Sequence, residues 1–199
     1  MKYLIIVILI LLFSIELIQA QDLQFYQEDL DFKIEENYFY VNGLYYFRNT
    51  SSMKMSRRLF YPLPQDKAYG KVDSIFVFNI QDSLQEINLR NNLKGSSFTI
   101  HIDPDTIAIY RIGYRQELKE TKAEYILTTT QTWGIPFTQV NYTLEFPKEF
   151  SLDSISYMPD SLREESEKYI LFWHKENFMP DKNFEINYKK QEGTLNGRE

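Results

Sequence analysis

The amino-acid sequence predicts an all-β fold, namely an antiparallel β-sandwich of immunoglobulin-like or jelly-roll-like type with about ten strands. Three observations support this prediction. Apolar residues recur at every second position in many short segments, which is the period of a strand with one buried face. Loop-forming residues separate those segments at short intervals. The chain of 199 residues also contains 15 tyrosines and 15 phenylalanines, which suit half-buried pleated surfaces.

The alternating segments are the clearest expected strands. In the first, Val41, Gly43, Tyr45 and Phe47 share one face and the residues between them share the other. The same alternation is found in residues 98–102, 142–146 and 184–188.

Other expected strands have different patterns. Residues 74–80 and 169–173 are apolar on both faces, which is typical of strands in the middle of a sheet. Residues 54–61 form a strand that Pro62 and Pro64 terminate, because proline cannot donate a ladder hydrogen bond. Only residues 161–168 have a helical composition, and no strand–helix alternation, linker or repeat is found.

The N-terminus has the layout of a secretory signal peptide. Lys2 precedes an unbroken apolar run from Leu4 to Phe13, and Ala20 offers a small residue before a cut at Gln21. The run is about half the length that a bilayer crossing needs, so a cleaved leader is favoured over an anchor. We therefore expect a signal peptide over residues 1–20, one sandwich domain over 21–190 and a polar C-terminal tail over 191–199.

Charge and cysteine content narrow the classes of function. The net charge of −6 and the lack of a basic run argue against nucleic acid or an anionic membrane as partner. No segment after the leader is apolar enough to span a bilayer. The absence of cysteine excludes thiol catalysis and thiolate metal sites, and favours a bacterial periplasm or cell surface.

Two segments carry a resemblance to known proteins. Residues 45–51, YYFRNTS, end a strand on aromatic-x-Asn before a polar turn, and residues 59–64, LFYPLP, close the next strand. This pattern resembles the opening of the vault/inter-alpha-trypsin type domain and of uncharacterised secreted bacterial β-sandwiches of similar plan. Residues 110–114, 125–130 and Trp133 look like later strands of the bacterial group. The resemblance implies a sandwich with a role in binding or assembly, and it carries no catalytic residue across.

The turn after Asn49 is expected to join the strands on either side of it into a hairpin. Asparagine favours such turns, and the two prolines would end the returning strand.

No residue is nominated for catalysis, and no cofactor or metal is expected. His101 lies near Asp103 and Asp105, but one histidine and two turn aspartates fall short of a zinc set. His174 is interpreted as a histidine at the end of a strand. Carboxylates in proline-containing loops, at Asp105, Asp160 and Asp181, leave a calcium-stabilised structural domain as an alternative.

Exposed aromatic rings would make a binding surface for a glycan or a protein of the envelope. The candidates are Tyr38, Tyr40, Tyr46, Trp133 and Trp173. Most aromatic side chains must instead fill the core between two sheets, so the exposure of these five decides between the two roles. Sheet edges with unpaired backbone groups are a second route to a partner.

Five segments read Asp, hydroxyl, aliphatic, and they resemble the O-glycosylation acceptor motif of exported proteins in the Bacteroidota. The acceptor hydroxyls would be Ser74, Ser83, Thr106, Ser154 and Ser161. The other interpretation is that Asp-Ser is a favoured way to leave a turn and enter a strand.

The sequence thus predicts an exported, non-enzymatic binding or assembly module in the envelope of a Gram-negative bacterium, with Bacteroidota as the expected group. A hydrolase whose site is built from loops is the second alternative, because sites can be grafted onto any fold.

Overall fold

The computed structural model describes residues 22–82 and 86–191. The expected signal peptide, Ser83 and nearly all of the expected tail lie outside these residues. The described part forms thirteen strands and one 3-10 helix. The large-sheet strands are β1 Leu23–Glu35, β2 Tyr38–Asn49, β4 Tyr69–Asn79, β7 Ile107–Leu118, β9 Phe137–Pro147, β11 Ser161–Glu164 and β12 Lys168–Phe178. The others are β3 Met55–Pro62, β5 Arg90–Asn92, β6 Gly95–Ile102, β8 Lys122–Tyr125, β10 Phe150–Ile155 and β13 Phe184–Lys190, with helix η2 at Thr128–Trp133.

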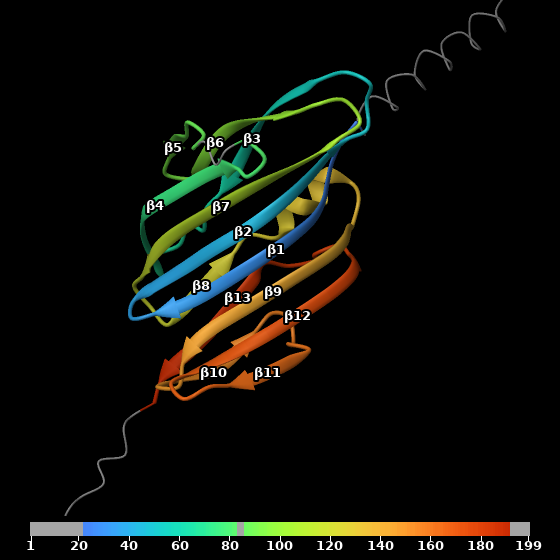
Figure 1. Ribbon diagram of the computed structural model, residues 1–199. Coiled ribbons are helices and arrows are strands. Elements are labelled where there is room, and N and C mark those ends of the chain that lie inside the picture. Colours follow the sequence, from blue (N-terminus) through green and yellow to red (C-terminus); the bar gives the residue numbers. More distant parts are fainter. Residues whose placement is uncertain (1–21, 83–85, 192–199) are drawn as a thin grey trace, which may run out of the picture.

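The strands form one broad sheet and two small ones. The seven-stranded sheet has the order β11-β12-β9-β1-β2-β7-β4, and the small sheets have the orders β10-β13-β8 and β3-β6-β5. Figure 1 shows β8 and β13 behind the strands of the large sheet. The predicted all-β sandwich is confirmed, with more strands than expected and a second layer that is divided in two.

One strand pairing departs from the antiparallel prediction. β1 and β9 run parallel, from Gln27 opposite Gln139 to Lys33 opposite Glu145. A parallel pair needs a long connection between its strands, and here that connection contains the whole β3-β6-β5 sheet and β8 of the other small sheet.

The apolar alternation places one face of the large sheet in the core. On β2, Phe39, Val41, Gly43, Tyr45 and Phe47 are buried, and the residues between them are half-buried on the other face. Rings from the small sheets cover the buried face: Phe184 of β13 stacks on Phe32 of β1 with centroids 4.8 Å apart. One continuous apolar core therefore lies between the layers.

A bulge in β1 changes which residues face this core. The pairing of β1 with β2 shifts register between Phe25 and Gln27. An extra residue reverses the alternation, so Phe25 and Glu28 both point inwards although they are three positions apart.

The expected hairpin around Asn49 is wrong. β2 pairs with β1 and β7, whereas β3 pairs with β6, so the chain crosses from the large sheet to a small one after Asn49. The fully buried Asn49 secures this crossing. Its Nδ2 donates to the carbonyl oxygens of Met53 at 2.7 Å and Asp103 at 3.1 Å, and its Oδ1 accepts from the backbone N–H of Ser51.

Two further expectations need correction. Residues 161–164 form strand β11 along the edge of β12, not a helix, because the cross-strand ladder overrides a weak helical composition. Residues 74–80 do not lie in the middle of a sheet, since β4 is the last strand of the large sheet. Its outward-facing Phe76 instead packs onto Gly113 of β7, which explains the apolar residues on both faces.

None of the described helices is both long and apolar enough for a bilayer crossing.

Gly95, which opens β6, is expected to be essential for the β3–β6 pairing. Its φ is +153°, and a Cβ at this position would lie 2.2 Å from the carbonyl oxygen of Tyr61, a backbone atom that cannot move aside. We expect Gly95→Ala to lower the free energy of unfolding by about 3 kcal/mol in a urea titration. Gly134 is the matched control, because its φ is +71° but an added Cβ would have no atom within 4 Å of it, so Gly134→Ala should cost about 1 kcal/mol. Equal losses would contradict this account.

Candidate functional site

The division of the second layer leaves a cavity of about 300 Å³ between the two small sheets. β1 and β2 form its floor, β3 forms one wall, and the end of β8 with helix η2 forms the other. The residues that shape it include Phe25, Glu28, Tyr45, Phe47, Arg58, Tyr61, Tyr125, Thr130, Thr132 and Trp133. A larger cavity of about 590 Å³ lies beside β5, but its charged lining residues, Arg58, Asp82, Glu86, Arg90 and His101, are all exposed to solvent.

Glu28 of β1 is one of the residues that line the smaller cavity. The residue is 1% exposed, and no ion pair found in residues 22–82 and 86–191 involves it. The Tyr142 hydroxyl donates to Oε1 and the Tyr125 hydroxyl donates to Oε2 at 3.4 Å. Burial raises the pKa of Glu28 from 4.5 to about 8, against the opposing effect of the two tyrosine hydrogen bonds. Glu28 is therefore a buried ionisable group that has no cationic partner among the described residues.

A chain of tyrosine hydroxyls extends from Glu28 across all three sheets. Tyr45 of β2 contacts both Tyr125 of β8, at 2.9 Å, and Tyr61 of β3, at 2.8 Å. We call Glu28, Tyr45, Tyr61, Tyr125 and Tyr142 the Glu28–tyrosine cluster. Burial raises the pKa of all four tyrosines well above the ordinary value, so their hydroxyls stay protonated and keep their capacity to donate.

Aromatic rings form the apolar part of the cavity. Phe25 stacks on Phe47 with centroids 5.0 Å apart, and Trp133 meets Phe25 edge-on at 5.7 Å. Helix η2 places Trp133 there and ends at Gly134, whose left-handed conformation turns the chain away. Hydrogen bonds from Thr128 to the Oδ1 of Asn183 hold the start of the helix.

The lining of this cavity supplies few groups for acid–base chemistry. Glu28 is the one acidic residue among the described residues that line it, and no histidine lines it. Glycoside hydrolysis needs two carboxyl groups facing each other across the substrate, which this lining does not supply. A polar floor beneath aromatic walls is instead typical of sites that bind small organic molecules.

The five aromatic residues expected to form one binding surface lie in different places. Tyr38, Tyr40 and Tyr46 are half-buried on the outer face of β2, with Arg115 placed 4.7 Å over the Tyr38 ring. Trp133 lies in the cavity on the opposite face. Trp173 is 2% exposed and donates from its ring nitrogen to the carbonyl oxygen of Tyr157, so it belongs to the core and to no exposed surface.

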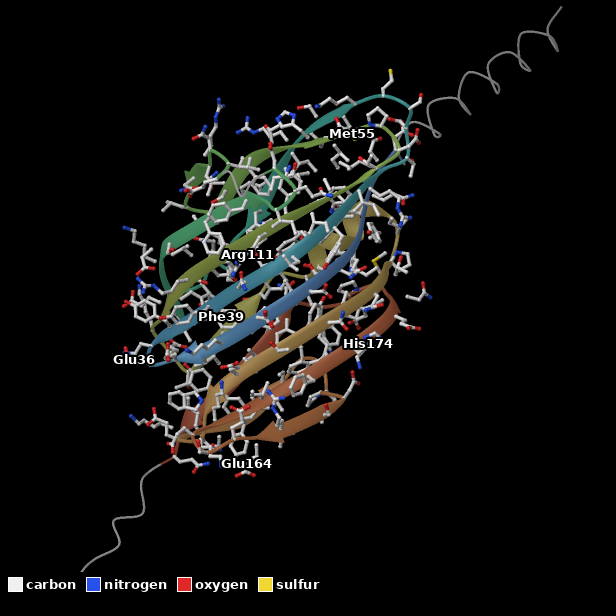
Figure 2. The ribbon with its side chains drawn as sticks, viewed as in Figure 1. Glu36, Phe39, Met55, Arg111, Glu164 and His174 are labelled. Carbon is white, nitrogen blue, oxygen red and sulfur yellow. The ribbon has the colours of Figure 1, made fainter. Side chains whose placement is uncertain are left out.

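The outer face of the large sheet carries a polar network. Figure 2 labels Arg111 of β7 and His174 of β12 on this face. His174 Nδ1 contacts Asn141 Oδ1 at 2.8 Å, and Asn141 in turn donates to Asp29. Arg111 donates to Asn42 at 2.8 Å. These cross-strand bonds satisfy the side chains that alternate with the core residues.

The structure keeps the candidate metal ligands apart. In the described ranges, no group of three or more His, Asp or Glu side chains is arranged to hold a metal ion. The carboxylate of Asp103 pairs with Lys54 at 3.0 Å, while the backbone N–H of His101 donates to the Tyr110 hydroxyl. Asp160 accepts from the backbone N–H of His174, and Asp181 accepts from the Tyr157 hydroxyl.

The hydroxyl groups of the Asp-hydroxyl-aliphatic segments lie at the surface. Ser74, Thr106, Ser154 and Ser161 are exposed, and Ser83 lies outside the described residues. Two of them already make hydrogen bonds: Thr106 donates to the Asp103 carbonyl oxygen and Ser154 accepts from Asn187.

Glu28 was not among the residues expected to form a site. Counted forward from Phe25, the alternation places Glu28 on the outer face, and the bulge in β1 corrects this count. A signal was nevertheless present. Leu30, Phe32 and Ile34 share the buried face, and extension of their period by one step towards the N-terminus reaches Glu28.

The burial of Glu28 predicts a pH-dependent stability. The folded protein holds a proton on Glu28 that the unfolded chain, with a pKa of 4.5, releases. Stability from this group is therefore full below that pKa and declines as the pH rises from about 5 to about 8, by up to about 1.4 kcal/mol per pH unit. Glu28→Gln should remove this slope, so the variant should equal the wild type near pH 5 and exceed it near pH 8. Urea titrations of both proteins across this range measure the difference in stability. Every other titrating group acts equally on the two proteins, so its effect cancels. Parallel curves of stability against pH would refute the assignment.

Comparisons with known proteins reveal similarity of fold. No protein-family model matches the chain, and no curated protein matches it. A Legionella pneumophila protein provisionally named a nutrient binding protein is similar, with a TM-score of 0.64 at 12% identity over 85% of this chain and 67% of that protein. An M1 zinc metallopeptidase mutant from Deinococcus radiodurans, bound to a Tyr-Ser-Ala substrate, gives a TM-score of 0.52 at 10% identity over 83% of this chain. The chain spans 42% of that metallopeptidase, so the similarity establishes a shared β-sandwich fold and no more.

Proposed function

We propose that this protein is a non-catalytic binding module that holds a small organic ligand in the Glu28 cavity. The single observation that carries the proposal is a buried carboxyl group, without a cationic partner, at the floor of a cavity with aromatic walls. Buried ionisable groups with shifted pKa values concentrate at functional sites, because stability alone disfavours them. The volume of about 300 Å³ lies at the small end of the range for such ligands.

Three features support binding over hydrolysis. The described lining residues provide one carboxyl group in place of a pair. The tyrosines of the Glu28–tyrosine cluster keep their protons, so none of them is available as a base near neutral pH. A metal-activated water has no ligand set among the described residues.

We further propose that the module acts in the envelope of a Gram-negative bacterium. The leader-like residues 1–20 and the lack of cysteine support this location. A role in binding also agrees with the provisional name of the similar Legionella pneumophila protein. The peptidase activity of the metallopeptidases is not part of the proposal, because this chain spans less than half of their length.

The fluorescence of Trp133 provides a direct test of ligand binding. The chain has two tryptophans, so Trp173→Phe leaves Trp133 as the reporter inside the cavity. Titration with a small-molecule extract of bacterial envelopes is expected to change the emission of this single-tryptophan protein, because a ligand replaces water beside the indole ring. Thr132→Phe, which adds a ring to the cavity lining, should abolish the change.

Thr138→Phe is the matched control, since Thr138 is exposed and does not line the cavity. It should leave the fluorescence change intact. An unchanged emission in the single-tryptophan protein, or equal responses of the two phenylalanine variants, would count against the cavity as a binding site.

The proposed location makes a separate prediction. The protein recovered from the envelope fraction of a Gram-negative host should begin at Gln21, and its intact mass, read by mass spectrometry, should lack residues 1–20. Recovery of the full-length chain from the cytoplasm alone would overturn the proposal of export and leave the cavity proposal untouched.

A further inference from the structure

We propose that the ligand of the Glu28 cavity is an organic amine with an apolar body, whose ammonium group pairs with Glu28 and whose apolar part lies against Phe25, Phe47 and Trp133. This inference rests on the proposed binding function. It goes further by assigning the charge of the ligand and the group that recognises it.

The carboxyl group of Glu28 has acceptor capacity to spare. An ionised carboxylate offers about four lone-pair sites. One is used by Tyr142, and the Tyr125 hydroxyl reaches the other oxygen only at 3.4 Å. Glu28 lines the cavity but is only 1% exposed, so the proposal requires that a donor entering the cavity reaches these remaining sites.

Among possible ligand groups, a cation gains the most from this floor. A purely apolar ligand would cover Glu28 and leave its remaining hydrogen-bonding sites without a partner, which costs free energy in a site with little water. An anion would gain no charge pairing from protonated Glu28 and would be repelled by its ionised form. An ammonium group makes a charge-assisted hydrogen bond, which is roughly twice as strong as a neutral one.

The aromatic walls favour the same charge. Rings carry negative electrostatic potential on their faces, so they attract a cation placed over them. The ring centroids of Phe25, Phe47 and Trp133 lie 5.0–5.8 Å from one another, so the three rings present a common apolar surface to the body of the ligand.

One charged group in the lining opposes a cation. Arg58 of β3 also lines the cavity, but its side chain is exposed, so solvent screens its charge. Glu28 is buried, so the charge that it acquires on losing its proton to pair with the ligand is unscreened and should decide the specificity. Because Glu28 favours a cation and Arg58 favours an anion, ligands of opposite charge distinguish the two residues.

Three compounds that each have one phenyl ring and a short side chain distinguish a cationic, a neutral and an anionic ligand: phenethylamine, 2-phenylethanol and 3-phenylpropanoate. Titrations use the Trp173→Phe protein and its Trp133 emission. Phenethylamine should bind at least tenfold more tightly than the other two, because it alone brings a positive charge to Glu28. Glu28→Gln should remove this advantage, whereas Glu35→Gln, the same change at an exposed position of β1, should keep it.

Binding of the amine should also release a proton. With a pKa of about 8, Glu28 is protonated in the free protein near pH 6.5, and pairing with an ammonium group requires the carboxylate. Calorimetry in two buffers of different ionisation enthalpy is expected to show release of about one proton, and affinity should rise up to about tenfold per pH unit below pH 8. A merely structural role for Glu28 would leave both quantities unchanged.

The outcomes distinguish this inference from the proposed function. Equal binding of the amine and the alcohol would overturn the amine assignment and leave an apolar binding cavity. Preference for 3-phenylpropanoate would overturn it in favour of Arg58 as the anchor. Failure of all three compounds would overturn the amine assignment as well, while the envelope-extract titration decides separately whether the cavity binds anything. The compound series on the protein with native Glu28 gives these results even if Glu28→Gln fails to fold.

Discussion

The hydrogen bonds around Glu28 connect three sheets that share no strand ladder with one another. Glu28, Tyr45 and Tyr142 belong to the large sheet, Tyr125 to the sheet of β8, and Tyr61 to the sheet of β3. In an ordinary sandwich, apolar packing alone joins the layers. Here the second layer is divided, and directional bonds between hydroxyl groups fix the three sheets relative to one another where they meet.

The same division of the second layer creates the cavity. Because β6 pairs with β3 and β5, and β13 pairs with β8 and β10, none of the strands that the structure describes bridges the two small sheets. Helix η2 lines one side of this gap and places Trp133 in it. The cavity thus arises from the topology itself, and the buried Glu28 gives it its chemical character.

Much of the fold is readable in the sequence. The period of two in β2, β6, β9 and β13 predicted those strands, because side-chain burial on one face of a sheet enforces that period. Which strands pair is not written in the period. The parallel pairing of β1 with β9 and the crossing after Asn49 depend on contacts between distant segments, so an Asn-containing turn looked like a local hairpin.

The candidate site was harder to predict than the fold. Of the five aromatic residues chosen from the sequence, Trp133 lines the cavity, three lie on the outer face of β2, and Trp173 lies in the core. A tyrosine or tryptophan in an alternating strand has the same appearance whether its ring is exposed or packed against a second layer. The burial of Glu28 was not predicted, because a bulge in β1 turns this acidic side chain inwards and the sequence alone does not indicate the bulge.

The parallel pair of β1 and β9 has a consequence for how the chain folds as it is synthesised. β2 follows β1 after a short turn and can cover one of its edges at once. The strand that covers the other edge, β9, ends at Pro147. That edge therefore stays open until more than a hundred residues beyond the end of β1 have been made. Pairings between segments this far apart form slowly, and an open edge in a half-made protein is a template for pairing with the wrong chain. Until β9 has been made, this edge of β1 is therefore open to mispairing.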